Sequence, residues 1–166
     1  MYAKIRIFNS SSGDRVYDAA DFAAYFGRLV SNGIFYANTN SLKVSAGSGM
    51  TVSVSAGAAW INGYSYENTS PHELILATAD GVYPRIDRVV VKLSIIDREI
   101  ILAVLTGTPS ASPTAPPLTR TSDVYELCLA EIEIPQGAVT VGEITDTRLD
   151  TELCGLVGSL VSAVYE

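Results

Sequence analysis

Few residues of this chain have the type and spacing that catalysis needs. The chain has one histidine, His72, which follows Pro71 at the start of a strand-like stretch. Ser70 is close enough in the sequence to be paired with it, but no nucleophile-elbow motif surrounds that serine. With one histidine and no suitably spaced cysteines, the chain lacks the ligands of a common zinc centre. We therefore expect His72 to be an exposed residue of an edge strand.

The glycines and carboxylates offer no stronger site. The Gly-Ser-Gly at 47–49 lacks the Lys-Ser/Thr of a phosphate-binding loop and precedes a strand, so we predict a turn. No acidic loop has calcium spacing. A glycosidase pair leaves no local signature and stays open. We predict no catalytic, cofactor-binding or metal-binding residue and no enzyme activity. The scattered carboxylates are Asp80, Asp87, Asp97, Asp123, Asp146 and Asp150.

Arginine and aspartate alternate in RIDR (85–88) and TDTR (145–148). Side chains two residues apart on a strand share a face, so such pairs can form ion pairs. We predict ion pairs that fix strand ends or subunit contacts.

Three aromatic residues flank Asn62-Gly63, a favoured type I′ hairpin pair. Together Trp60, Tyr64 and Tyr66 could form a sugar-binding platform. With a two-residue loop, however, Tyr64 and Tyr66 fall on one face of the hairpin and Trp60 on the other. The three are therefore weak ligand candidates, and sheet or interface packing is the favoured interpretation. The predicted cross-strand pairs are Ile61 with Tyr64, Trp60 with Ser65 and Ala59 with Tyr66.

Composition bounds the function. In 166 residues, 48% are hydrophobic and only 17% are charged, where about a quarter is usual. The shortfall suggests a surface covered by another subunit. The net charge of −7 argues against nucleic acid as a partner, and no basic run suits an anionic membrane. We find no signal peptide and no transmembrane segment. Cys128 and Cys154 are expected to be small buried residues, with an intersubunit disulfide as the alternative.

The secondary structure changes character along the chain. A helix is predicted near 18–31, with Asp18 as N-cap, Asp21 three residues later and an apolar face directed at the core. Eight short segments of period two follow, separated by Gly, Asn, Asp or Pro turns. This pattern predicts a mainly β fold, an antiparallel β-sandwich or barrel. The proline-rich 107–121 is expected to be an ordered strap or surface loop, with a flexible linker as the alternative. The eight segments are 42–47, 50–57, 58–61, 64–67, 72–77, 88–96, 99–107 and 124–134.

The last residues show a heptad spacing of leucines, 4, 3 and 4 apart. We predict a β-rich domain over 1–148 and a C-terminal oligomerisation helix over 149–166, although Gly155 and Gly158 lower its helix propensity. Packing of this helix on the β domain is the alternative. The predicted interface residues are Leu149, Leu153, Leu156 and Leu160.

Several segments together resemble tail structural proteins of phages and prophages of Gram-positive bacteria. In that group they form the N-terminal, particle-proximal module of baseplate or receptor-binding tail-fibre proteins. The similar segments are GDRVYDAADFAAYFGRLVSNGIF, GMTVSVSAGAAWINGYSYEN, RIDRVVVKLSIIDREIILAVLTGTPSASPTAPPLTRTSDVYELCLAEIEIPQGA and ITDTRLDTELCG.

The resemblance implies a β-rich, homotrimeric module of the virion, made in the bacterial cytoplasm. Its partners would be other copies of itself and other tail or baseplate proteins. It would anchor a fibre or receptor-binding element for host attachment, and it carries no catalytic motif. The alternative function is a carbohydrate-binding adhesin that recognises a host cell-wall saccharide. A cell-wall hydrolase ranks below both.

Overall fold

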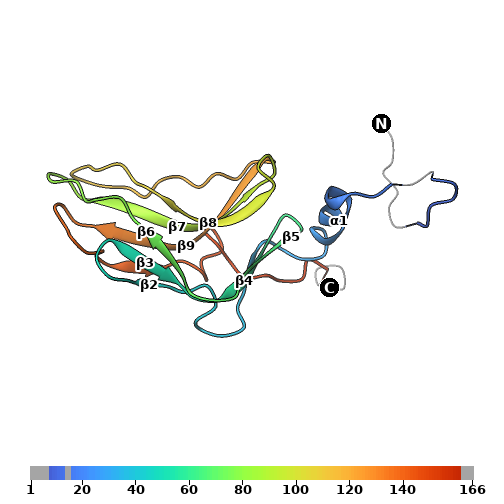
Figure 1. Cartoon of the computed structure of the whole chain (residues 1–166), viewed down its shortest axis with the longest axis horizontal. Helices are drawn as coiled ribbons and strands as arrows, with labels where there is room; N and C mark the ends of the chain where they lie inside the picture. The colour runs from blue at the N-terminus through green and yellow to red at the C-terminus, as the bar shows by residue number, and fades with distance from the viewer. Residues whose placement is uncertain (1–7, 14–15, 162–166) are drawn as a thin grey trace.

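The fold is mainly β, as predicted, with one short helix at one end (Figure 1). The structure is a computed structural model that describes residues 8–13 and 16–161. Eight of its strands fall in the eight predicted segments. Strands β2 to β9 are Val44–Ala46, Thr51–Val54, Gly57–Ile61, Tyr64–Asn68, His72–Ile75, Arg85–Ser94, Glu99–Leu105 and Val124–Ile134.

Two strands of three residues each were not predicted, β1 (Gly33–Phe35) and β10 (Ile144–Asp146). Each adds an edge to a sheet whose other strands were predicted. β1 pairs with β4, and β10 pairs with β9, both antiparallel. With three residues each, they are too short for a period-two pattern to be recognised in the sequence.

The helix α1 (Ala19–Phe26) is shorter than the predicted 18–31. The Asp18 side chain accepts a hydrogen bond from the Asp21 backbone N–H at 3.0 Å, and the Asp21 side chain accepts from the Asp18 N–H. This capping box satisfies two of the backbone donors that begin a helix. The helix ends at Gly27.

The strands form three antiparallel sheets, ordered β1-β4-β5, β10-β9-β7-β8 and β2-β3-β6. Figure 1 shows the β2-β3-β6 sheet facing the β10-β9-β7-β8 sheet, with β1-β4-β5 between these layers and α1. Inward-facing aliphatic residues of all three sheets form one core. Val52, Val91 and Leu129 are among its fully buried members.

The register of the β4–β5 hairpin is confirmed. Ile61 pairs with Tyr64, Trp60 with Ser65 and Ala59 with Tyr66. Asn62 and Gly63 both have positive φ, 51° and 88°, as a type I′ turn requires.

The proline-rich segment is an ordered strap, as predicted. It connects β8 to β9, which run parallel to each other on either side of β7. Arg88 on β7 donates to the carbonyl of Pro116 at 2.6 Å and forms an ion pair with Glu131 at 2.6 Å. Further along, the Thr119 N–H donates to the Glu126 carboxylate at 2.7 Å. These bonds hold the strap against the sheet.

Candidate functional site

The residues considered for catalysis lie apart from one another. His72 is exposed at the start of β6, the edge strand of its sheet, where the sequence predicted it. Because the chain has one histidine, no second imidazole can join His72 in a metal or catalytic site. Within the described residues, no three His, Cys, Asp or Glu side chains gather in a way that could hold a metal ion.

The first Arg-Asp alternation forms a buried ion pair, as predicted. The Arg85 Nε lies 3.0 Å from the Asp87 Oδ1, with both side chains at most 3% exposed. Arg85 also donates to the carbonyls of Ala77 and Thr78, and Asp87 accepts from the Gly107 N–H at 2.8 Å. These bonds tie the start of β7 to the segment after β6 and to Gly107 at the start of the strap, so the pair has a structural role.

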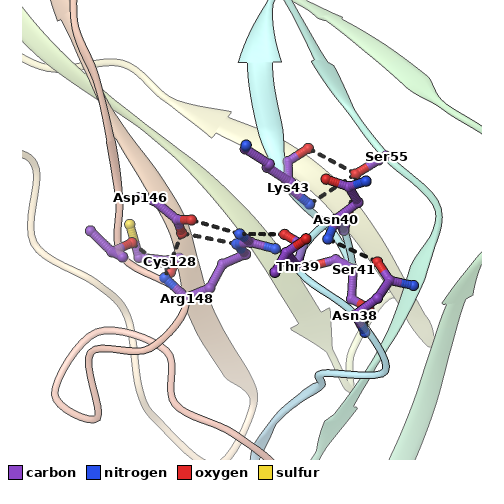
Figure 2. A network of polar contacts seen from close by, with 10 residues as sticks. Asn38, Thr39, Asn40, Ser41, Lys43, Ser55, Cys128, Asp146 and Arg148 are labelled. Atoms are coloured by element: carbon purple, nitrogen blue, oxygen red, sulfur yellow. Dashed lines mark hydrogen bonds and ion pairs between the residues drawn. The ribbon is translucent and has the colours of Figure 1, made fainter.

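The second alternation forms an ion pair at the other edge of the sheet, also as predicted (Figure 2). The Arg148 guanidinium donates to Asp146 at 2.9 and 2.6 Å. It also donates to the carbonyls of Ser41 at 2.6 Å and Thr39 at 3.0 Å. The Tyr36 ring lies 5.5 Å from the guanidinium carbon. Arg148 therefore ties the end of β10 to the segment between β1 and β2.

Hydrogen bonding by Arg148 lowers the pKa of Asp146 below its ordinary value of 3.8. The same contact raises the pKa of Arg148. Both directions favour the charged forms, which is the signature of a structural ion pair. A general acid or base would need the opposite tuning, toward neutral pH.

The three aromatic residues of the hairpin do not share one face. Tyr64 and Tyr66 are half-buried and pack against the core, and burial raises the pKa of Tyr66. Trp60 lies on the other face of the hairpin, where its ring meets Phe26 of α1 edge to face at 6.0 Å. The buried indole Nε1 of Trp60 has no hydrogen-bond partner in the structure. The hairpin is thus packed on both sides.

Both cysteines are buried free thiols. The Cys128 N–H donates to the Leu153 carbonyl at 2.9 Å, which brings the segment of Cys154 against β9. Burial raises the pKa of Cys128, and it raises the pKa of Cys154 to about 12. Protonated, buried thiols behave as small apolar residues, as the sequence predicted.

The prediction that the aromatic face of α1 packs in the core is wrong. Phe22 is 52% exposed, and Tyr25 and Phe26 are each 43% exposed. The helix contacts the hairpin through the Phe26 ring, which meets Trp60, and through the backbone at Ala23. A Cβ on Gly63 would lie 2.0 Å from the Ala23 carbonyl oxygen, so backbone meets backbone there. Phe22 and Tyr25 are left exposed.

The predicted C-terminal helix is not confirmed. Over 149–161 the chain forms turns and isolated bridges, and 162–166 lie outside the described residues. The Leu153 and Cys154 N–H groups donate to the Asp150 carbonyl, which makes a single turn. Gly155 then adopts φ +84°, a left-handed conformation that ends a helix.

Without a helix, the heptad spacing no longer aligns the four leucines. Leu149 is 59% exposed in the turn after Arg148, and Leu153 is half-buried with its carbonyl bonded to β9. Leu156 and Leu160 are 43% and 48% exposed. The four leucines therefore do not form one seam, and contact of any of them with another subunit stays a prediction.

The C-terminal segment runs beside the end of α1. The Leu160 N–H donates to the Leu29 carbonyl at 2.9 Å, and the Ser31 N–H donates to the Gly158 carbonyl at 2.9 Å. Leu156 forms a bridge with Ile34. Exposed apolar residues from both ends of the chain thus adjoin. We call this set the apolar end face; its members are Phe22, Tyr25, Phe26, Leu29, Leu156 and Leu160.

The predicted heptad seam included two members of this face, Leu156 and Leu160, although the helix that it assumed over 149–161 does not form. The others were assigned to the core, because an amphipathic stripe looks alike whether it meets the core or a partner. The low charge content of the chain also predicted a surface covered by another subunit, and that stays a prediction.

No family model and no curated protein matches this chain. Among the described residues, no helix combines the length and the apolar character needed to cross a membrane.

Proposed function

We propose that this chain is a structural protein of a phage or prophage virion. It is a tail or baseplate module that assembles as an oligomer, a homotrimer by the resemblance, and anchors a fibre or receptor-binding element. The observation that carries the proposal is the apolar end face, which supplies a surface for assembly. The resemblance of the sequence to tail proteins is the reason for assigning that assembly to a phage tail or baseplate.

The internal organisation supports an assembly role over a catalytic one. Each of the two Arg-Asp pairs, the residues most suggestive of chemistry, bonds to backbone groups of other segments and holds those segments together. The function proposed is therefore geometric: a rigid body that presents a docking surface.

The architecture that fits best is a sandwich whose layers approach at both edges. β10 lies next to β2, and β6 lies next to β8, so the edges of the two larger sheets adjoin on each side. Arg148 bonds across one of these edges. Covered edges protect a β protein from unwanted strand pairing, which suits a protein present in many copies.

The alternative is a carbohydrate-binding adhesin. It has less support, because Tyr64 and Tyr66 are occupied in core packing and Trp60 is covered by Phe26. No exposed aromatic cluster remains on the hairpin for a sugar ring to stack on.

Light scattering coupled to size exclusion tests the proposal. We expect a mass near three times 17.6 kDa. A 17.6 kDa monomer at every concentration would remove the assembly role. Glycan-array binding that is lost in Trp60→Ala would replace it with the adhesin function.

A further inference from the structure

We infer that the apolar end face is the surface through which copies of this chain associate. The inference rests on the proposed oligomer and adds where its contact lies. The occupant of the face is a second copy of this chain, which presents the same residues. Three independent properties of the face lead to this assignment: the weak support of α1, the exposed area and the local charge.

The helix α1 lacks enough packing within its own chain. It has eight residues, and its one buried side chain is Ala23. Isolated helices shorter than about 12 residues are marginal in water, and most helices owe their stability to a buried apolar face. Phe22 and Tyr25 of α1 are exposed, and Phe26 is 43% exposed although its ring meets Trp60, so covering these side chains by a partner would supply the missing packing. Aromatic residues such as Phe22 and Tyr25 are also enriched at the centres of protein interfaces.

The chain exposes more surface than a compact monomer does. Its accessible area is 10032 Å². A monomer of 17.6 kDa is expected to expose about 7,900 Å², so the excess is about 2,100 Å². Exposed residues ahead of α1 contribute to this excess, so it does not measure the apolar end face alone. The six members of the face are each 38–52% exposed, and a cluster of large apolar side chains at the surface marks an interaction site.

Local charge favours a second copy over a partner of opposite charge. The whole chain carries −7, so two copies repel each other over most of their surface. The segments that build the apolar end face, 19–34 and 153–161, hold one acidic and one basic residue, Asp21 and Arg28. The charge there cancels. A basic partner would gain more electrostatic attraction from the acidic remainder of the molecule, whereas two copies repel each other least at this neutral, apolar end.

The experiment compares charge insertions inside and outside the face. Phe22→Glu and Leu160→Glu place a carboxylate in it, one from each end of the chain. Val139→Glu is the matched control, because Val139 is 80% exposed and lies between β9 and β10, next to Gly49 of the β2–β3 turn and outside the segments that build the face. All three positions are exposed, and glutamate near the start of a helix is favourable, so the fold should persist. Circular dichroism checks that it does.

The expected result is an oligomer for the wild type and for Val139→Glu. Each face variant should raise the subunit dissociation constant at least about tenfold, and the double variant should be monomeric by light scattering. A double variant that is folded and keeps the wild-type mass would overturn the inference and leave the oligomeric function standing. A wild type that is monomeric at all concentrations would end both.

A second measurement needs no substitution. Hydrogen exchange of the wild type, followed by mass spectrometry, should show slower exchange over 19–29 as protein concentration rises. Exchange in the turn around Val139 should not depend on concentration. Concentration-independent exchange over 19–29 in an oligomeric sample would place the contact elsewhere.

Discussion

Arg148 and Asp146 form an ion pair of 2.6 Å in which the arginine side chain is 3% exposed and the aspartate side chain 46% exposed. The pair is thus asymmetric. The arginine side chain is buried and also donates hydrogen bonds to the carbonyls of Ser41 and Thr39, while the aspartate side chain lies at the surface.

This asymmetry predicts unequal effects of removing the two partners. Arg148→Leu leaves two carbonyls without their donor and should lower the free energy of unfolding by about 2–4 kcal/mol. Asp146→Asn should cost clearly less, because the site stays half solvated and an amide oxygen can still accept a hydrogen bond. Urea unfolding measures both. Equal losses would show that the ion pair, and not the carbonyl contacts, carries the stability.

The lowered pKa of Asp146 predicts a dependence of stability on pH. A carboxyl group whose pKa is lower in the folded state stabilises the fold above its ordinary value of 3.8. That contribution is lost as the pH falls through the folded-state pKa. The stability difference between the wild type and Asp146→Asn should therefore shrink between about pH 5 and pH 2. Urea midpoints of both proteins across this range test it, and a difference that stays constant would contradict the assignment.

The buried thiols should be unreactive in the folded protein. With the pKa of Cys154 raised to about 12, almost no thiolate is present at pH 8, and the pKa of Cys128 is raised as well. Iodoacetamide should leave both thiols unmodified in the native protein and modify both in urea, as read by mass spectrometry. Native labelling of Cys154 would mean that the C-terminal segment opens readily.

Gly63 should be the glycine least tolerant of a side chain at the hairpin. Its φ is +88°, and an added Cβ would clash with the Ala23 backbone, so Gly63→Ala should push α1 off the hairpin. Gly137→Ala is the matched control, with φ +61° and no atom within 4 Å, and should cost only the about 1–2 kcal/mol of a left-handed alanine. The single tryptophan reports the difference, because Trp60 packs against Phe26 of α1. Its fluorescence should shift to the red in Gly63→Ala and stay unchanged in Gly137→Ala.

Features with a local cause could be predicted from the sequence. Asn62-Gly63 defines a two-residue turn, and that turn determines the register of the whole hairpin. The alternation of Arg85 and Asp87 puts both side chains on one face of a strand, where they meet. In each case the residues that decide the structure lie within a few positions of one another.

Features decided by distant partners could not be predicted. The helical seam required residues 149–161 to be helical, but the Gly155 carbonyl instead accepts a hydrogen bond from the Ile34 N–H, more than a hundred residues away in the chain. The direction of the α1 face depends on Ala23 meeting Gly63, a contact that periodicity does not reveal. The apolar end face combines both features, and the sequence located only part of it.

The pairing of 155–160 with 29–34 also bears on the order in which this protein is made. A ribosome completes α1 and β1 long before it reaches Leu156, so a nascent chain carries only the first half of the apolar end face. The second half joins only after residues 155–160 have been made. A chain that stalls before them would lack a complete apolar end face, and the fold would thereby keep such copies out of an assembly.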